Sequence, residues 1–340
     1  MNFVLLEFGK DKTAILKGIA IIMMIIHHCT CGPGWFDHSI PAMDERFFVV
    51  YINGATRFCV ALYAFLVGFG FSFSKKRDLL YSLKHIWNLL LTYWIILFLF
   101  SVPFGFKNIE GGFPEVVLNM FGISRSLSWV NWFVYFYIFQ MITLPFLSRV
   151  IDKRPIPLTL FFIAIFLGMN VVMKIFQVES NLWTDALFAC CIYSPIVLEG
   201  YLFGKMKWFS MIKLPVHWLL TLLACLILIC APALRCLGLS VVSEWALVPL
   251  MITAVLYLFT AFRLPLCTKV LSSLGDVSVY MWFFHALFFT RSVRWFWQRF
   301  ILISDSIIII TLWTILLTFV CSWALKFIVD RVIKTVHARG

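Results

Sequence analysis

Residues 13–31 have the sequence TAILKGIAIIMMIIHHCTC, an apolar run about as long as the hydrocarbon core of a bilayer requires. Comparable runs recur along the whole chain of 340 residues, of which 62% are hydrophobic and only 13% charged. Soluble domains carry about 25% charged residues, and their surfaces cannot accommodate so much apolar area. The composition therefore indicates an all-α polytopic membrane protein, and it excludes a soluble enzyme, a secreted disulfide scaffold and a nucleic-acid-binding protein.

Hydropathy windows of about 19 residues predict a bundle of ten transmembrane helices in a single membrane domain covering residues 1–340. The predicted helices are 13–31, 55–74, 83–104, 129–150, 157–175, 184–204, 215–235, 243–262, 270–291 and 300–326. The longest connections are 32–54 and 105–128, and residues 114–124 are either a shallow interfacial helix or a loop. Long loops often build binding surfaces, so these two connections are candidates for one.

The distribution of basic residues predicts the direction of these helices. With the N-terminus on the cytoplasmic side, the inner segments hold about twice as many of the 28 Lys and Arg residues as the outer ones. We therefore predict that both termini are cytoplasmic and that the long connections face outward. Arg291, Arg294 and Arg299 break the pattern on the outer side, either as tolerated exceptions or as a site for an anionic group.

The ten cysteines predict no metal or redox site. Most stand singly inside apolar runs, and neither Cys29 with Cys31 nor Cys190 with Cys191 has the spacing of a recurring zinc or redox motif. We interpret them as small residues of the core.

Titratable residues at membrane depth cost roughly 2.5–3.5 kcal/mol each and are therefore the first candidates for function. In the first helix, Lys17 and His28 lie on one face and about 16 Å apart along the axis. The simpler interpretation is that Lys17 snorkels to the inner headgroups while His27 and His28 cap the outer end. The functional interpretation is a crevice in which the cation holds an anionic ligand and the imidazole acts as base or nucleophile.

A second imidazole, His285, lies within the ninth predicted helix at a depth similar to that of His28. One histidine in an aromatic helix is usually structural, but two at matched depth on different helices favour a shared site. Ser278 and Tyr280 on the same helix are candidates for substrate binding. Trp132, at the start of the fourth helix, is a further candidate, although an interfacial aromatic belt is also expected there.

Cationic candidates flank the second predicted helix. Arg57 enters its outer end, ahead of a Gly-containing stretch at 65–72 that suits either close helix packing or passage of a ligand. Beyond its inner end, Lys76, Arg77 and Lys84 form a patch that suits phosphates, although topology alone also predicts positive charge there.

Four motifs of this chain occur in the same order as in a known family. Lys17 and His28 form an Arg/Lys-x10-His pattern, and 65–71 is similar to Phe-Phe-Leu-Ser-Gly-Tyr-Gly. Trp132-Phe133 follows, and the late pattern Gly-x-x-Ser-x-x-(Ile/Leu)-Trp-x-x-His is matched by Gly275, Ser278, Trp282 and His285. Over about residues 12–290 the chain thus resembles the acyltransferase-3 family of bacterial integral-membrane acyltransferases.

Two departures limit the transfer of residue roles from this family. Val67 stands where the family usually has Ser, so no serine role is assigned there. The basic stretch after the second helix lacks the family's Pro and is reduced to Lys75, Lys76, Arg77 and Lys84. No esterase-like domain follows the last helix, and we expect the stand-alone form of the family.

The resemblance implies an acyl-CoA-dependent O-acyltransferase, most often an acetyltransferase, of the bacterial inner membrane. Its acceptor would be a sugar hydroxyl of a cell-surface or lipid-linked polysaccharide. The phosphates of the donor, acetyl-CoA, would contact Lys17, Lys84, Lys76 and Arg77, and no metal is expected. The alternative function is a flippase or exporter of a lipid-linked sugar, which would share the ten helices and the scarcity of buried charge.

The residues themselves supply a mechanism that is compatible with this activity. His28 would either deprotonate the acceptor hydroxyl or carry the acyl group itself. Arg57 and His285 would orient one of the substrates or stabilise the developing oxyanion. The expected partners are acyl-CoA, the sugar acceptor and membrane lipid, with or without self-association into a homo-oligomer.

Overall fold

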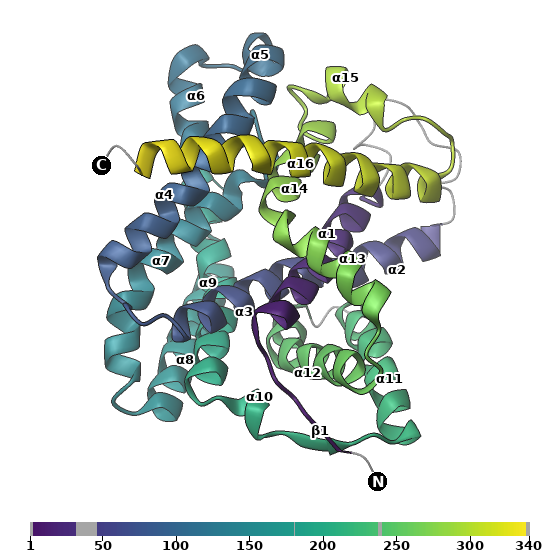
Figure 1. The fold of residues 1–340 in the computed structure, drawn as a ribbon. Helices are drawn as coiled ribbons and strands as arrows, with labels where there is room; N and C mark the ends of the chain where they lie inside the picture. The colour runs from purple at the N-terminus through teal and green to yellow at the C-terminus, as the bar shows by residue number, and fades with distance from the viewer. Residues whose placement is uncertain (1–2, 32–45, 180, 237–239, 338–340) are drawn as a thin grey trace.

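The computed structural model describes residues 3–31, 46–179, 181–236 and 240–337, in which helices dominate (Figure 1). The first half contains β1 (Phe3–Leu5), α1 (Lys10–Cys29), α2 (Arg46–Thr56), α3 (Phe58–Ser72), α4 (Leu79–Ile96), α5 (Val102–Gly105), α6 (Gly112–Met120), α7 (Trp132–Ile151) and α8 (Pro155–Ile175). The second half contains α9 (Leu182–Lys205), α10 (Trp208–Met211), β2 (Lys213–Pro215), α11 (Trp218–Cys236), α12 (Ser240–Ala261), α13 (Pro265–Asp276), α14 (Ser278–His285), α15 (Arg294–Trp297) and α16 (Ile307–His337). A π-helical segment occupies Leu97–Ser101, and 3₁₀ turns occupy Phe106–Asn108, Trp129–Asn131, Ala286–Phe288 and Gln298–Phe300.

Helices occupy all ten positions at which the sequence predicts them, which confirms an all-α polytopic fold. Within the described residues, eight helical segments are long and apolar enough to span a membrane, and a bent pair makes a ninth. The segment predicted at 215–235 contains a shorter apolar helix, Trp218–Leu234. The alternative left open at 114–124 is resolved as a helix, α6, whereas most of the predicted connection 32–54 lies outside the described residues.

The predicted continuous helix at 270–291 is wrong. The chain forms α13 and α14, which meet at Val277 with a bend of 63°. The bend follows Gly275, where a Cβ would lie 1.9 Å from the carbonyl oxygen of Ala14 in α1. Glycine permits this contact between backbones and also weakens the helix, so α13 packs closely on α1 before the chain changes direction. The bend turns α14 along the outer half of α1, which carries His28.

Close contacts at glycines also join α3 to α9. A Cβ built on Gly68 would lie 1.8 Å from Val197 O, and one built on Gly200 would lie 2.1 Å from Phe65 O. Only residues without a side chain allow the two backbones to approach this closely, as is common between membrane helices. Gly70, two residues beyond Gly68, has no atom within 4 Å of its Cβ position.

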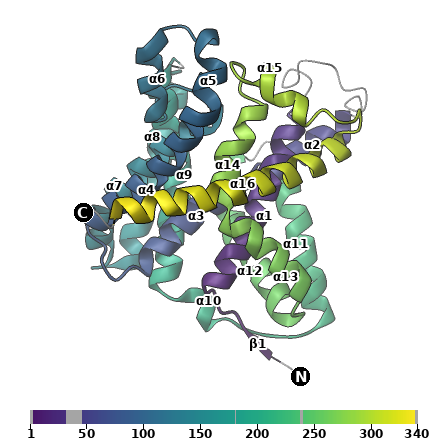
Figure 2. The same ribbon diagram turned by 45° about the horizontal axis from the view of Figure 1, so that its top comes forward.

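Helix α1 contacts α2, α3, α12, α13, α14 and α16. In both ribbon views α16 crosses the outside of α14 and α4 (Figures 1 and 2). Near the N-terminus β1 pairs with β2 in an antiparallel arrangement, with Phe3 opposite Pro215. The site described below lies along α1, between α3, α7, α9 and α14.

We expect Gly68→Ala to destabilise the protein because its methyl group would overlap the backbone of α9. Overpacking of this kind costs about 1–3 kcal/mol, which should lower the thermal midpoint of the purified protein in detergent. Gly70→Ala is the matched control, since it makes the same change on the same helix in open space. Equal midpoints for the two variants would contradict the proposed close contact of α3 with α9.

Candidate functional site

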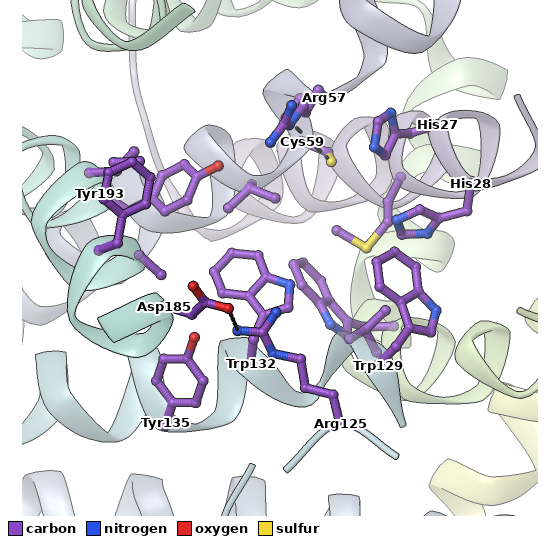
Figure 3. A pocket seen from close by; sticks show the side chains of 17 residues that line it. His27, His28, Arg57, Cys59, Arg125, Trp129, Trp132, Tyr135, Asp185 and Tyr193 are labelled. Carbon is purple, nitrogen blue, oxygen red and sulfur yellow. Dashed lines mark hydrogen bonds and ion pairs between the residues drawn. The ribbon is translucent and has the colours of Figure 1, made fainter. Parts of the chain in front are cut away.

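Two pockets lie along α1. We call the one at the C-terminal end of α1 the outer pocket, after the predicted direction of this helix; its volume is about 310 Å³ (Figure 3). Its charged and titratable lining residues are His27, His28, Arg57, Cys59, Arg125, Tyr135, Asp185 and Tyr193, and its indole rings are Trp129, Trp132 and Trp282. Aromatic rings beside charged and hydrogen-bonding groups form a surface suited to a polar ligand with an apolar face.

The second, or inner, pocket lies nearer the N-terminal end of α1 and has a volume of about 300 Å³. Lys17 and His85 line it together with the aromatic residues Tyr63, Tyr81, Phe133 and Tyr137. The ammonium group of Lys17 and the imidazole of His85 are the groups in this pocket that could contact an anionic cofactor. Within the described residues, no three His, Cys, Asp or Glu side chains lie close enough together to hold a metal ion.

Three aromatic side chains separate the two pockets, and we call them the aromatic partition: Tyr63, Phe133 and Trp282. Tyr63 and Phe133 line the inner pocket, whereas Trp282 lines the outer one. The ring centroid of Trp282 lies 4.9 Å from that of Tyr63 and 4.5 Å from that of Phe133. The cation Lys17 and the imidazole of His28 therefore line two pockets with a thin wall between them, where the sequence predicts one open crevice.

The two histidines at matched depth are in direct contact. Nδ1 of His28 lies 2.7 Å from Nε2 of His285, and the two rings are nearly parallel. Nδ1 of His285 lies 3.0 Å from the carbonyl oxygen of Met281, one turn earlier in α14. His28 is 5% exposed and lines the outer pocket, whereas His285 is fully buried behind it.

These contacts determine where the protons lie when both rings are neutral. A carbonyl oxygen accepts only, so Nδ1 of His285 carries a proton and its Nε2 is an acceptor. Nδ1 of His28 must then donate to Nε2 of His285, which leaves Nε2 of His28 as the unprotonated nitrogen. The ring that lines the pocket thus carries the basic nitrogen, and the ring behind it fixes the tautomer.

The end of α1 is fixed by a second set of hydrogen bonds. Nδ1 of His27 donates to the carbonyl oxygen of Asn53 over 2.9 Å, and Nδ2 of Asn53 donates to the carbonyl oxygen of His27 over 2.8 Å. The indole of Trp129 packs edge-on against the His28 ring, with centroids 4.5 Å apart. These contacts hold the end of α1 and the His28 ring in place without using Nδ1 of His28, which pairs with His285.

Several candidates chosen from the sequence meet at these pockets. Arg57 and Trp132 line the outer pocket with His28, and Trp132 stacks on Tyr193 with centroids 5.8 Å apart. Lys17 and Ser278 line the inner pocket. In the motif stretch at 65–72, Gly68 packs closely against α9, as the packing interpretation predicts, and Gly70 lines the inner pocket.

Other candidates are not brought to the pockets. Tyr280 points toward Thr92 and Asp330 on the α4 and α16 side and lines neither pocket. Lys76 and Lys84 are exposed at the end of the bundle that carries the inner pocket and do not line it.

Arg77 is engaged in an ion cluster that joins three segments. Its guanidinium lies 3.0 Å from Asp152 and contacts the hydroxyl of Tyr201, while Lys205 Nζ lies 3.0 Å from the same carboxylate. Burial raises the pKa of the Asp152 carboxyl, but hydrogen bonds from Tyr201 and Lys205 and the charges of Arg77 and Lys205 outweigh it and hold the pKa below its usual value. The cluster ties the loop after α3 to the ends of α7 and α9.

Arg125 and Asp185 were not singled out from the sequence, yet they form an ion pair of 3.7 Å that lines the outer pocket. Arg125 is positioned by the carboxylate of Glu115 in α6, which accepts hydrogen bonds from Ser124 and Ser126 on either side of it. The sequence signal for Arg125 is only that it stands between two serines in the long predicted connection 105–128. No helical periodicity marks such a residue, so only the fold brings it to the pocket.

Comparison with known proteins identifies the family of the chain. A family model described as an acyltransferase domain matches residues 14–327, which is nearly the whole chain. No curated protein and no solved structure matches the chain.

We expect Asp152→Asn to lower the thermal midpoint at neutral pH by the equivalent of about 1–3 kcal/mol, because it removes charged hydrogen bonds from the cluster. A carboxyl with a lowered pKa stabilises the fold above its unfolded pKa of about 3.9 and loses this effect as the pH falls through its folded pKa. The difference from wild type should therefore shrink on acidification toward about pH 3. Asp305→Asn, at an exposed carboxyl, is the control. A difference that is independent of pH would contradict this role of the cluster.

Proposed function

Since the chain belongs to the acyltransferase-3 family and is a membrane acyltransferase, we propose that it transfers a short acyl group from cytoplasmic acyl-CoA to a sugar hydroxyl. The acyl group is acetyl, and the acceptor is a cell-surface or lipid-linked polysaccharide at the inner membrane of a bacterium. The observation that carries this proposal is the His28–His285 pair, whose basic nitrogen belongs to the ring that lines a pocket beside a thin aromatic partition.

The donor occupies the inner pocket in this proposal. Lys17 and His85 line that pocket and supply positive or hydrogen-bonding nitrogen to phosphate oxygens, while the aromatic walls suit the pantetheine arm. Lys84 and Lys76 are exposed at the same end of the bundle and attract the remaining phosphates. The thioester then reaches the aromatic partition from the inner side.

The acceptor occupies the outer pocket. The indole rings of Trp129 and Trp132 and the phenol of Tyr193 offer flat apolar surfaces for a sugar ring, and the Asp185 carboxylate accepts hydrogen bonds from sugar hydroxyls. The sugar hydroxyl that receives the acyl group lies at Nε2 of His28 in this proposal. The partition thus lies between the donor and acceptor pockets, and in the reaction the thioester passes it beside Trp282 to meet the hydroxyl at His28.

In the reaction, Nε2 of His28 takes the proton of the acceptor hydroxyl as its oxygen attacks the thioester carbonyl carbon. The Nδ1 proton of His28 strengthens its hydrogen bond to His285 as the positive charge develops. Collapse of the tetrahedral intermediate breaks the carbon–sulfur bond. The CoA thiolate leaves and receives the proton from Nε2, which restores the neutral pair.

Trp282 supplies the donor for the developing oxyanion. Its ring is 4% exposed, and its Nε1 is buried without an acceptor among the described residues. A buried N–H that lacks an acceptor costs about 1–3 kcal/mol, so a group that binds there is stabilised. The carbonyl oxygen of a thioester at the partition provides that acceptor.

In the alternative route, Nε2 of His28 would first carry the acyl group as an acyl-histidine. Radiolabel from the donor distinguishes this route from direct transfer, because only the acyl-histidine route leaves label on the protein. We favour direct transfer because the pair fixes the tautomer of a base. Protein in vesicles mixed with radiolabelled acetyl-CoA alone should then retain no label on His28. Addition of a bacterial polysaccharide should move label to the glycan, whereas movement of a lipid-linked sugar across the vesicle without CoA dependence would indicate a flippase.

We expect His28→Ala to reduce label transfer by about 100- to 10,000-fold, since it removes the general base. His285→Ala leaves that base present with an unfixed ring and should cost about ten- to hundredfold. His217→Gln, at the start of α11 and outside both pockets, is the control. Full activity of a folded His28→Ala protein would refute the mechanism in both its forms.

We expect Trp282→Phe to lower kcat by about 100-fold with little change in the KM for acetyl-CoA, because phenylalanine keeps the partition filled but has no N–H. Trp323→Phe, at a residue that is 66% exposed on α16, makes the same change outside the site. A Trp282→Phe enzyme with normal kcat would remove Trp282 from the oxyanion role and leave the role of His28 intact.

A further inference from the structure

The outer pocket contains more positive charge than the reaction requires. Two guanidinium groups, those of Arg57 and Arg125, line it, against the single carboxylate of Asp185. Asp185 pairs with Arg125 over 3.7 Å. Neither arginine has a part in the proton transfer at His28, so the excess charge indicates a property of the ligand.

Arg57 provides this excess. It is the single residue between α2 and α3, and in the part of the chain that the structure describes no carboxylate pairs with its guanidinium. Figure 3 shows its side chain across the pocket from the Arg125–Asp185 pair, with the ring of Trp132 between them in that view. Arg57 is an exposed residue that lines this aromatic pocket, so its guanidinium is open to a ligand, and it matches the planar oxygens of carboxylate and phosphate groups.

The two polar sides of the pocket therefore differ in what they recognise. Asp185 is already balanced by Arg125 and accepts hydrogen bonds from neutral hydroxyls. Arg57 donates from a cation and selects an anion. A ligand that reached both sides across the indole rings would be a sugar with hydroxyls at one edge and a negative group at the other.

We infer that the sugar acceptor carries an anionic group, carboxylate or phosphate, which Arg57 holds while one of its hydroxyls meets His28. This inference rests on the proposed function, because it names the class of acceptor that the same site takes. A charge-assisted pair of this kind favours the acidic sugar over its neutral counterpart by about ten- to hundredfold.

The test compares matched acidic and neutral sugars. The probes are the methyl glycosides of glucuronic and galacturonic acid, those of glucose and galactose, and a hexose phosphate. Binding is measured as quenching of tryptophan fluorescence, since three indoles line the pocket, and transfer is measured with radiolabelled acetyl-CoA. We expect at least one acidic sugar to bind about tenfold or more tighter than its neutral counterpart, and high salt to reduce this preference.

Variants assign the preference to one residue. Arg57→Gln should abolish it, and Arg57→Lys should keep part of it, because lysine retains the charge but not the planar geometry. Arg149→Gln is the control, since Arg149 is an exposed arginine in the last turn of α7 and lines neither pocket. The thermal midpoint of each variant shows that loss of preference is not loss of fold.

Each outcome decides the inference. Preference for a uronic acid assigns the anion to a carboxylate, and preference for the hexose phosphate assigns it to a phosphate. Equal binding of acidic and neutral sugars, no saturable quenching by any acidic sugar, or an unchanged preference in Arg57→Gln would overturn it. Transfer of label to acidic and neutral sugars alike would overturn the inference and leave the proposed function standing. Selective binding of acidic sugars without any label transfer would support the preference for an anion and contradict the proposed transfer reaction.

Discussion

The hydrogen bond between Nδ1 of His28 and Nε2 of His285 is the contact on which the site depends. It joins the first helix to one that lies far along the chain, and the carbonyl oxygen of Met281 gives it a direction. Because that carbonyl fixes one proton, the basic nitrogen of the neutral pair lies on the ring at the pocket. The arrangement resembles a base and its orienting group in other acyl-transfer enzymes, with a second imidazole in place of a carboxylate.

The fold supplies this contact through close backbone packing. Gly18 lies against Leu271, and Gly275 lies against Ala14, so α1 and α13 are held together before the bend at Val277. The bend then aligns α14 with the outer half of α1. An unbent ninth helix would continue in the direction of α13, so the same glycine contact that holds the two helices together also positions His285 beside His28.

The sequence was sufficient for the features that depend on local pattern. Hydropathy located the helices, and the similar depth of His28 and His285 in their helices favoured a shared site, whereas their direct contact is known only from the structure. The bend, the engagement of Arg77 by Asp152 and the pair of Arg125 with Asp185 depend on contacts between distant segments, which periodicity does not encode. Contacts with distant segments also set the direction of a polar side chain on a buried helix, as for Tyr280, which points toward Thr92 and Asp330.

NMR spectroscopy of protein labelled with ¹⁵N in its histidine rings tests the tautomer of the pair most directly. Comparison with the His28→Ala protein assigns the His28 signals. We predict that at neutral pH Nδ1 of His28 carries a proton and couples across the hydrogen bond to Nε2 of His285, while Nε2 of His28 has the shift of an unprotonated nitrogen. A proton on Nε2 of His28 at that pH, or the absence of coupling between the two rings, would contradict the proposed role of the pair.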